Sequence, residues 1–479
     1  MTDLTEPAPT HDLVVSVNAF TGTEVVSGPF APTHQAWALT TARIEEPPSP
    51  LLPTVVDQAA WCRDDVGWGV ILPEPPDHSP AALDTADDAP EPIQELVAAR
   101  RGKVLRYRAS SDYAEWTLRD YAGHGDLLNA MSPPGSGPNQ LPRYLLIYAG
   151  PERIPWHLQY SLNPVRYVGR LDLEGEQLAN YVTSLINGWP DSEARYDSPV
   201  VWSVDLGGGK TDITTLMRET IAAPIHTRLS QDADISRAQF IDGAAMDATG
   251  QTLAEALERD KPCLVVTTSH GMTGPLSDHD VMRAHLGMPV DQAGRLVHPD
   301  RLLTKWQPDG AIWFAQACCS AGADSPSTYQ GLFEAGSLLD RMLQAVANNG
   351  PMTSPLPRAL LGAPKPLRAF VGHVEPTFNW TMSFPPNRQV LTSDIGEVLY
   401  QRLCLGKPVG LAMRPYYQSV GSLLIGYGKA VSDYNVSVHD ADERRALDMA
   451  LYSKVVAYDR VGTVILGDPT AAIPVPKGL

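Results

Sequence analysis

Two short apolar runs decide the fold of this chain: Cys263-Leu264-Val265-Val266-Thr267-Thr268-Ser269 and Ala311-Ile312-Trp313-Phe314-Ala315-Gln316-Ala317. Each run is rich in β-branched or aromatic residues and is bounded by turn-forming residues, which is typical of buried parallel strands. His270 and Gly271 follow the first run, and Cys318 follows the second. Reactive groups collect at the carboxyl ends of parallel strands, so we expect the imidazole and the thiol at one edge of the same sheet.

An imidazole beside a thiol supplies the two groups that a cysteine peptidase needs. Cys318 would attack a peptide carbonyl, and His270 would deliver a proton to the leaving amine. The amides of Gly271 and Cys318 would stabilise the oxyanion, and Gly271 allows close approach because it has no side chain. Gln316-Ala317-Cys318 also matches the Q-A-C signature of caspases, although Cys319 stands where that signature has Arg, Gln or Gly. The plain alternative is two buried strands that end in His and Cys by coincidence.

Composition narrows the class of protein. The 479 residues include 37 basic and 55 acidic ones, so a net charge of −18 argues against direct binding to nucleic acid. The five cysteines form no disulfide framework and no CxxC metal site, which favours a reducing compartment. We recognise no signal peptide at the N-terminus and no apolar run of about 20 residues that would cross a membrane. The expectation is a soluble, cytoplasmic protein without membrane association.

Proline content and the alternation of segments divide the chain into three expected parts. Residues 1–92 carry many of the prolines and are expected to form an irregular N-terminal region. Residues 93–198 alternate strand-like and helix-like segments, including an expected helix over 114–128, but offer no nucleophile. Residues 199–479 repeat the alternation and contain both apolar runs. This order predicts an α/β fold with a doubly wound, mainly parallel sheet flanked by helices.

Two further segments make the pattern more specific: Thr377-Phe378-Asn379-Trp380 and Val464-Ile465-Leu466-Gly467-Asp468-Pro469. Together with the His-Gly and Ala-Cys blocks, they resemble the caspase-like cysteine peptidases of clan CD. The blocks are similar to those of caspases, separases and CHAT-type peptidases. The two further segments most resemble the gingipain family, which places a tryptophan over the P1 side chain and closes its catalytic domain with Gly-Asp-Pro. The likeness covers roughly residues 140–475, but the secretion signal, propeptide and adhesin regions of gingipains are not recognisable.

The resemblance implies a caspase-like catalytic domain at 199–479, preceded by a non-catalytic α/β subdomain at 93–198. Cys318 would be the nucleophile, His270 the general acid/base, and Asp205 the third catalytic acid that orients His270. Asp212 would be the acidic determinant of the P1 pocket, with Trp380 as its lid.

Gln316, two residues before the nucleophile, is also assigned to substrate binding. A carboxylate beneath an aromatic ring suits a basic side chain, so we expect cleavage after Arg or Lys. Lys210 complicates this expectation, because an inward-pointing ammonium would neutralise Asp212.

Several alternatives stay open at this point. Asp205 could simply bond the turn amides of Gly207–Gly209, and Asp212 could serve only as a helix N-cap. The segment 205–212, DLGGGKTD, also resembles the phosphate-binding hairpin of actin and Hsp70-type ATPases, but we find no second Asp-x-Gly hairpin. A catalytically inactive interaction protein on the caspase fold is the third possibility. Cys319 is expected to be a buried apolar residue or redox partner rather than a second nucleophile.

We expect no cofactor and no catalytic metal. No segment has the spacing of an EF-hand loop, and His279, His285 and His298 lack ligand spacing. The family resemblance admits a structural calcium ion. The expected partners are a protein substrate and a regulatory or activating partner, because an endopeptidase must be restrained.

Overall fold

A computed structural model describes residues 56–75, 83–207, 212–384, 387–437 and 440–476, and the backbone of strands β1 (Val14–Phe20) and β2 (Val25–Pro29). Gly208, Gly209 and Lys210 lie outside these residues, and with them the expectation about the Lys210 ammonium. The chain divides into two compact units. The larger unit comprises Thr54–Leu423 and Lys454–Leu479, and the smaller one Met1–Pro53 and Leu424–Ser453.

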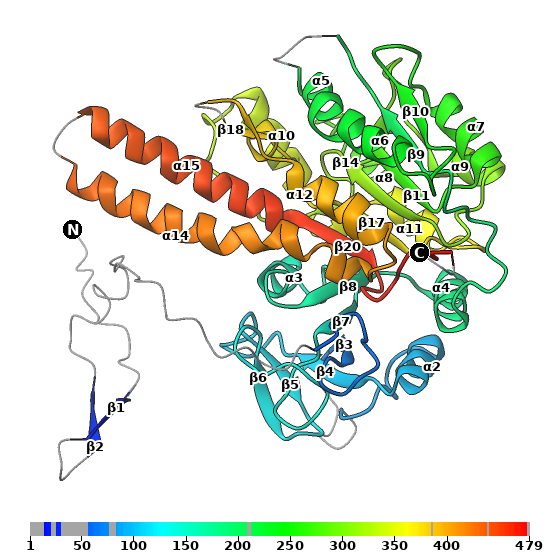
Figure 1. Ribbon diagram of the computed structural model, residues 1–479. Coiled ribbons are helices and arrows are strands. Elements are labelled where there is room, and N and C mark those ends of the chain that lie inside the picture. Colours follow the sequence, from blue (N-terminus) through cyan, green and yellow to red (C-terminus); the bar gives the residue numbers. More distant parts are fainter. Residues whose placement is uncertain are drawn as a thin grey trace. The chain divides into compact units, whose positions relative to one another are not determined.

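The larger unit is built around a 12-stranded sheet (Figure 1). In spatial order its strands are β10 (Gln239–Asp242), β9 (Val200–Ser203), β11 (Leu264–Thr268), β14 (Ile312–Gln316), β17 (Ala369–His373), β20 (Thr463–Gly467), β8 (Tyr167–Leu171), β7 (Tyr144–Tyr148), β3 (Trp68–Pro73), β4 (Lys103–Tyr107), β5 (Thr117–Asp120) and β6 (Gly125–Leu128). The strands from β10 to β17 are parallel to one another, and so are those from β20 to β4. β17 and β20 pair antiparallel, so the two halves of the sheet run in opposite directions. The expectation of an α/β fold with a large, mostly parallel sheet is confirmed.

Helices follow most strands and flank the sheet. They are α2 (Glu91–Arg100), α3 (Trp156–Leu162), α4 (Gly175–Asn187), α5 (Ile213–Met217), the π-helical η3 (Arg218–Ala222), α6 (Ala223–Ser230), α7 (Gly250–Asp260), α8 (His279–His285), α9 (Pro299–Lys305), α10 (Leu338–Ala347), α11 (Pro355–Leu361), α12 (Ser393–Gly396), the π-helical η5 (Glu397–Leu403) and α13 (Val409–Ala412). Two helices of 23 residues each, α14 (Arg414–Val436) and α15 (Asp440–Gly462), precede β20.

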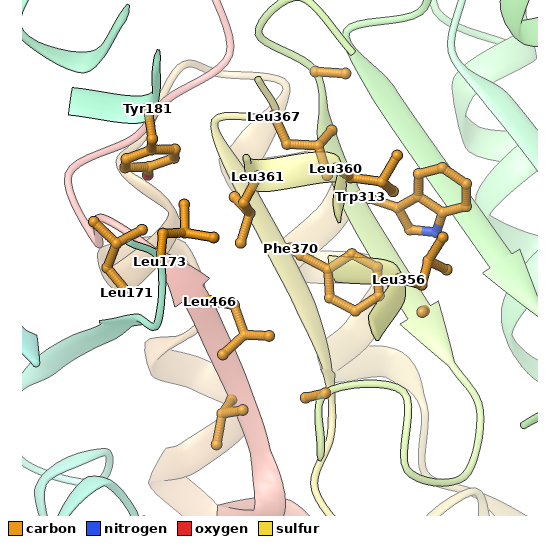
Figure 2. Close-up of a cluster of buried hydrophobic side chains, with 14 of the residues drawn as sticks. Leu171, Leu173, Tyr181, Trp313, Leu356, Leu360, Leu361, Leu367, Phe370 and Leu466 are labelled. Atoms are coloured by element: carbon orange, nitrogen blue, oxygen red, sulfur yellow. The ribbon is translucent and has the colours of Figure 1, made fainter. Parts of the chain in front are cut away.

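Successive side chains of the central strands point to opposite faces of the sheet, and both faces are buried. On β14, Trp313 packs into one hydrophobic core and Phe314 into the other. Figure 2 shows the first core, in which Trp313 and Phe370 lie near leucines of α11 and Leu466 of β20. This core continues into the other half of the sheet through Leu171 and Tyr181, so the two halves share one interior.

The segment after β20 is anchored to other elements of the same half of the sheet. Asp468, which follows β20, is completely buried and accepts hydrogen bonds from Trp68 Nε1 at 3.0 Å and Arg100 Nη1 at 3.1 Å. Trp68 begins β3, a central strand of its half of the sheet. The region 1–92, expected to be irregular, therefore supplies a strand to the sheet.

The expected helix over 114–128 is wrong. The chain forms the antiparallel strands β5 and β6 there, joined by a turn in which His124 has a φ of 54°. The Gly123 amide donates to the Asp120 side chain at 2.8 Å and fixes this turn. Leu118 and Asp120 are buried while Thr117 and Arg119 are less so, which is the alternation of a strand rather than a helix.

Candidate active site

His270 and Cys318 lie at the same edge of the sheet. β11 and β14 are parallel neighbours with Thr268 opposite Gln316, and each candidate residue lies two positions beyond that pair. The main chain confirms that the two segments touch, because a Cβ placed on Gly271 would overlap the carbonyl oxygen of Cys318. His270 is exposed, whereas Cys318 is partly buried.

The requirement for glycine at position 271 thus has a structural reason that differs from the expected one. Its missing side chain allows the histidine segment to pack directly on the cysteine segment, rather than only allowing a substrate to approach. His270 and Gly271 form the short strand β12, which pairs antiparallel with β13 (Pro289–Val290). The pairing fixes the main chain that carries the imidazole.

The thiol of Cys318 contacts the main chain of Thr377. The Thr377 amide donates to Sγ at 3.4 Å, and Sγ lies 3.8 Å from the Thr377 carbonyl oxygen. Burial raises the pKa of the Cys318 thiol to about 11, although the Thr377 amide acts in the opposite direction. At neutral pH the thiol is therefore protonated in this conformation.

The amide of Cys318 was expected to bind the oxyanion. Among the residues that the structure describes, this N–H forms no main-chain hydrogen bond to another residue. The following amide, of Cys319, donates to the Glu375 carbonyl oxygen at 2.8 Å. The expected assignment of the Cys318 amide is compatible with these contacts.

Cys319 is completely buried and has a φ of 54°. Its side chain packs among Met282, Leu286 and Ala323, and burial raises the pKa of its thiol well above the usual value. This confirms the expectation of a buried apolar residue. A protonated thiol in this cluster cannot serve as a second nucleophile without rearrangement.

Asp205 follows β9, and its carboxylate contacts the turn after it and the helical segment that follows. Oδ1 accepts from the Thr215 hydroxyl at 2.6 Å and from the Gly207 amide at 2.9 Å, while Oδ2 lies 3.8 Å from Arg218 Nε. We find no contact between Asp205 and His270 in the described part of the chain. These contacts match the structural alternative, in which Asp205 stabilises the turn.

Asp212 is the N-cap of α5, and its charge also acts on His270. Its Oδ1 accepts from the Thr214 amide at 2.7 Å, the Thr214 hydroxyl at 2.5 Å and the Thr215 amide at 3.4 Å. Burial alone would raise the pKa of Asp212, but these hydrogen bonds and the nearby His270 lower it below its ordinary value. Asp212 is thus a helix cap that lies close enough to the imidazole for the two charges to interact.

Gln316 and Trp380 occupy different environments. Gln316 is 2% exposed, so its side chain does not face solvent at the sheet edge. Trp380 lies in the 3₁₀ turn η4 (Asn379–Thr381) and packs against a small cluster that contains Tyr329 and Val455. β9 and β17 flank the β11–β14 pair, so the segments bearing Asp212 and Trp380 follow strands on opposite sides of that pair.

The segment 205–212, on which the actin-like alternative depends, is described only at Asp205–Gly207 and Asp212. β9, which precedes it, pairs in parallel with both β10 and β11, and α5 follows Asp212. Within the described ranges, no group of three or more His, Cys, Asp or Glu side chains is arranged to hold a metal ion. No helix there is both long and apolar enough to cross a membrane.

Three residues that make notable contacts were not singled out from the sequence: Thr377, His373 and Asp459. Thr377 belongs to the segment singled out for Trp380, but its main-chain contact with the thiol has no sequence signal. His373 and Asp459 form a buried pair with Nδ1 and Oδ1 3.7 Å apart. His373 ends an apolar run, which was a usable sequence signal, whereas Asp459 lies on a helix 86 residues further along the chain.

No protein-family model and no curated protein sequence matches this chain.

Proposed function

We propose that this protein is a cysteine endopeptidase of the caspase-like type, with Cys318 as nucleophile and His270 as general acid/base. The adjacency of their segments carries the proposal: two parallel strands in register end in His270-Gly271 and Cys318, and Gly271 packs on the Cys318 carbonyl. The thiol gives its proton to the imidazole directly or through a water, and the sulfur attacks the carbonyl carbon. The imidazolium then protonates the leaving amine, and water hydrolyses the thioester.

The two acidic residues have roles that differ from those expected from the sequence. Asp205, bonded to Thr215 and Gly207, stabilises the turn that carries the next helix. Asp212 is the carboxylate whose charge interacts with His270.

A basic P1 side chain is the substrate that this charge favours. The helix cap uses Oδ1 of Asp212, and Oδ2 is assigned to a substrate guanidinium or ammonium. Such a charge-assisted hydrogen bond contributes about 1.5–3 kcal/mol, so Arg or Lys should be preferred about ten- to a hundredfold over an uncharged isostere. Trp380, on the opposite side, is assigned to the wall of the P1 pocket.

The buried Cys318 thiol also supports the idea that the peptidase requires activation. Because burial raises the pKa of Cys318 to about 11, only a small fraction of the thiol is ionised at neutral pH. A regulatory partner or a protein substrate that moves the Thr377 segment would expose the sulfur.

A fluorogenic peptide library varied at P1 tests the proposal. We expect cleavage after Arg or Lys that disappears in Cys318→Ala and falls strongly in His270→Ala. The specificity assignment requires that Asp212→Ala lose most of the preference for a basic P1. Activity that persists in Cys318→Ala would refute the proposed mechanism, and preferential cleavage after Asp would refute the pocket.

A further inference from the structure

The main chain that follows β17 runs beside the loop that carries Cys318. At Glu375 it is bonded to this loop twice: the Cys319 amide donates to the Glu375 carbonyl oxygen at 2.8 Å, and the Glu375 amide donates to the Gly322 carbonyl oxygen at 3.0 Å. Two residues further on, the Thr377 amide donates to Cys318 Sγ at 3.4 Å. The position of Thr377 against the sulfur therefore depends on how the chain is held at Glu375.

The side chain of Glu375 holds a second loop. It is 2% exposed, and its two carboxyl oxygens accept from the Thr328 amide at 3.2 and 3.1 Å. Both the charged and the neutral carboxyl can accept from an amide, so this contact does not depend on the protonation state. The next residue, Tyr329, packs edge-on against Phe378 with the ring centroids 4.8 Å apart. These two contacts fasten the loop at 327–329 to the segment 375–378, which contains Thr377.

The backbone at position 375 favours a different residue. Glu375 has a φ of 68°, in the left-handed region that glycine adopts readily and that residues with a Cβ rarely adopt. Glutamate is thus an unfavourable residue for the turn alone, and the hydrogen bond with Thr328 gives a physical reason for its side chain. The same conformation allows the side chain to be removed by substitution with glycine without straining the main chain.

We infer that Glu375 is a positioning residue that keeps Thr377 against the Cys318 sulfur, and that the contact between Glu375 and Thr328 is the point at which the site is released. As a regulatory role, this inference rests on the peptidase function proposed above. While the contact is made, the segment 375–378 stays in place and the thiol stays covered. Thr328 is exposed, so a regulatory partner can reach the loop at 327–329 and draw it away. The segment then loses its support from this loop, and the sulfur becomes accessible to a substrate.

The test is the rate at which iodoacetamide alkylates Cys318 at pH 8. All variants carry Cys62→Ser, because Cys62 is exposed, and adducts are located by mass spectrometry. Glu375→Gly should react about tenfold faster, which is the change that loss of one hydrogen bond permits. Glu375→Gln keeps an oxygen that can accept from Thr328, so it should react at close to the parent rate. Arg101→Gly, which places glycine at another left-handed position (φ 49°) after α2, is the matched control and should not change the rate.

The buried Cys263 and Cys404 distinguish release of the segment from a general loss of structure. Both belong to a different hydrophobic cluster from the one beside Cys318, and they should stay unlabelled in Glu375→Gly. Labelling of these two cysteines as fast as that of Cys318 would overturn the inference.

If Glu375→Gly does not fold, Glu375→Asn is measured in its place, because asparagine tolerates the left-handed region and has a shorter side chain. A folded variant of either kind that reacts no faster than Arg101→Gly overturns the inference. Glu375→Gln reacting as fast as Glu375→Gly would also overturn it, since the hydrogen bond to Thr328 would then not be what holds the segment.

Alkylation requires no substrate, so its outcome is separate from the proposed function. A faster reaction of Glu375→Gly in a protein that cleaves no peptide would support the role of Glu375 while rejecting the peptidase. Peptidase activity with an unchanged alkylation rate would reject the role of Glu375 alone.

Discussion

Gly271→Ala should destabilise the protein and separate the two reactive residues. A Cβ at this position would overlap the Cys318 carbonyl oxygen and would also lie 2.9 Å from the Cys318 carbonyl carbon. The obstructing atoms belong to the main chain, so no side-chain rotation relieves the overlap. Either β12 or the Cys318 loop must move. Overpacking of this kind costs about 1–3 kcal/mol.

Gly125→Ala is the matched control, because a Cβ there meets nothing closer than 3.6 Å. Urea unfolding of both variants gives the loss of stability, and alkylation of Cys318 together with peptide cleavage reports on the site. We expect Gly271→Ala to lose about 1–3 kcal/mol and most of its activity, and Gly125→Ala to lose little of either. Equal stability and activity in the two variants would mean that His270 and Cys318 do not depend on this close packing.

Three further predictions concern single side chains. Asp468→Asn should lower the free energy of unfolding by about 3–5 kcal/mol in a urea titration, because it leaves Arg100 buried without its counter-charge; a loss below about 1 kcal/mol would contradict this. Cys319→Ala should leave peptide cleavage and the site of alkylation unchanged, and an adduct that disappears with this variant would reject Cys318 as nucleophile. Asp205→Asn should lower the melting temperature and have little effect on turnover, whereas Asp212→Asn should lower kcat/KM for an Arg substrate about ten- to a hundredfold. A larger loss of activity in Asp205→Asn than in Asp212→Asn would restore Asp205 as the catalytic acid.

The sheet was predictable where the sequence signal is local. The runs at 263–269 and 311–317 are continuous apolar segments with β-branched and aromatic residues, and both form central strands. Their common edge follows from parallel pairing, which the register confirms. The strands β5 and β6 were missed because four-residue strands joined by a tight turn give too short an alternation to distinguish from a helix.

The site was less predictable because the sequence does not show which groups its residues contact. Asp205 and Asp212 are seven positions apart and both carry a carboxylate, so the sequence alone does not distinguish their roles. Their hydrogen bonds separate them, since Thr215 and Gly207 bind Asp205 while Asp212 caps α5 near His270. The antiparallel pairing of β17 with β20 brings Asp459 to His373, and no local pattern specifies that pairing.

Mass mapping of the adduct formed with a peptidyl chloromethyl ketone tests the central claim most directly. With Arg at P1, we expect a single adduct on Cys318, which forms much more slowly in His270→Ala and not at all in Cys318→Ala. The same peptide with Asp at P1 should react slowly with the unchanged protein. An adduct on Cys62 or Cys319, or an equal rate in the unchanged protein and in His270→Ala, would contradict the assignment of His270 and Cys318 as a catalytic pair.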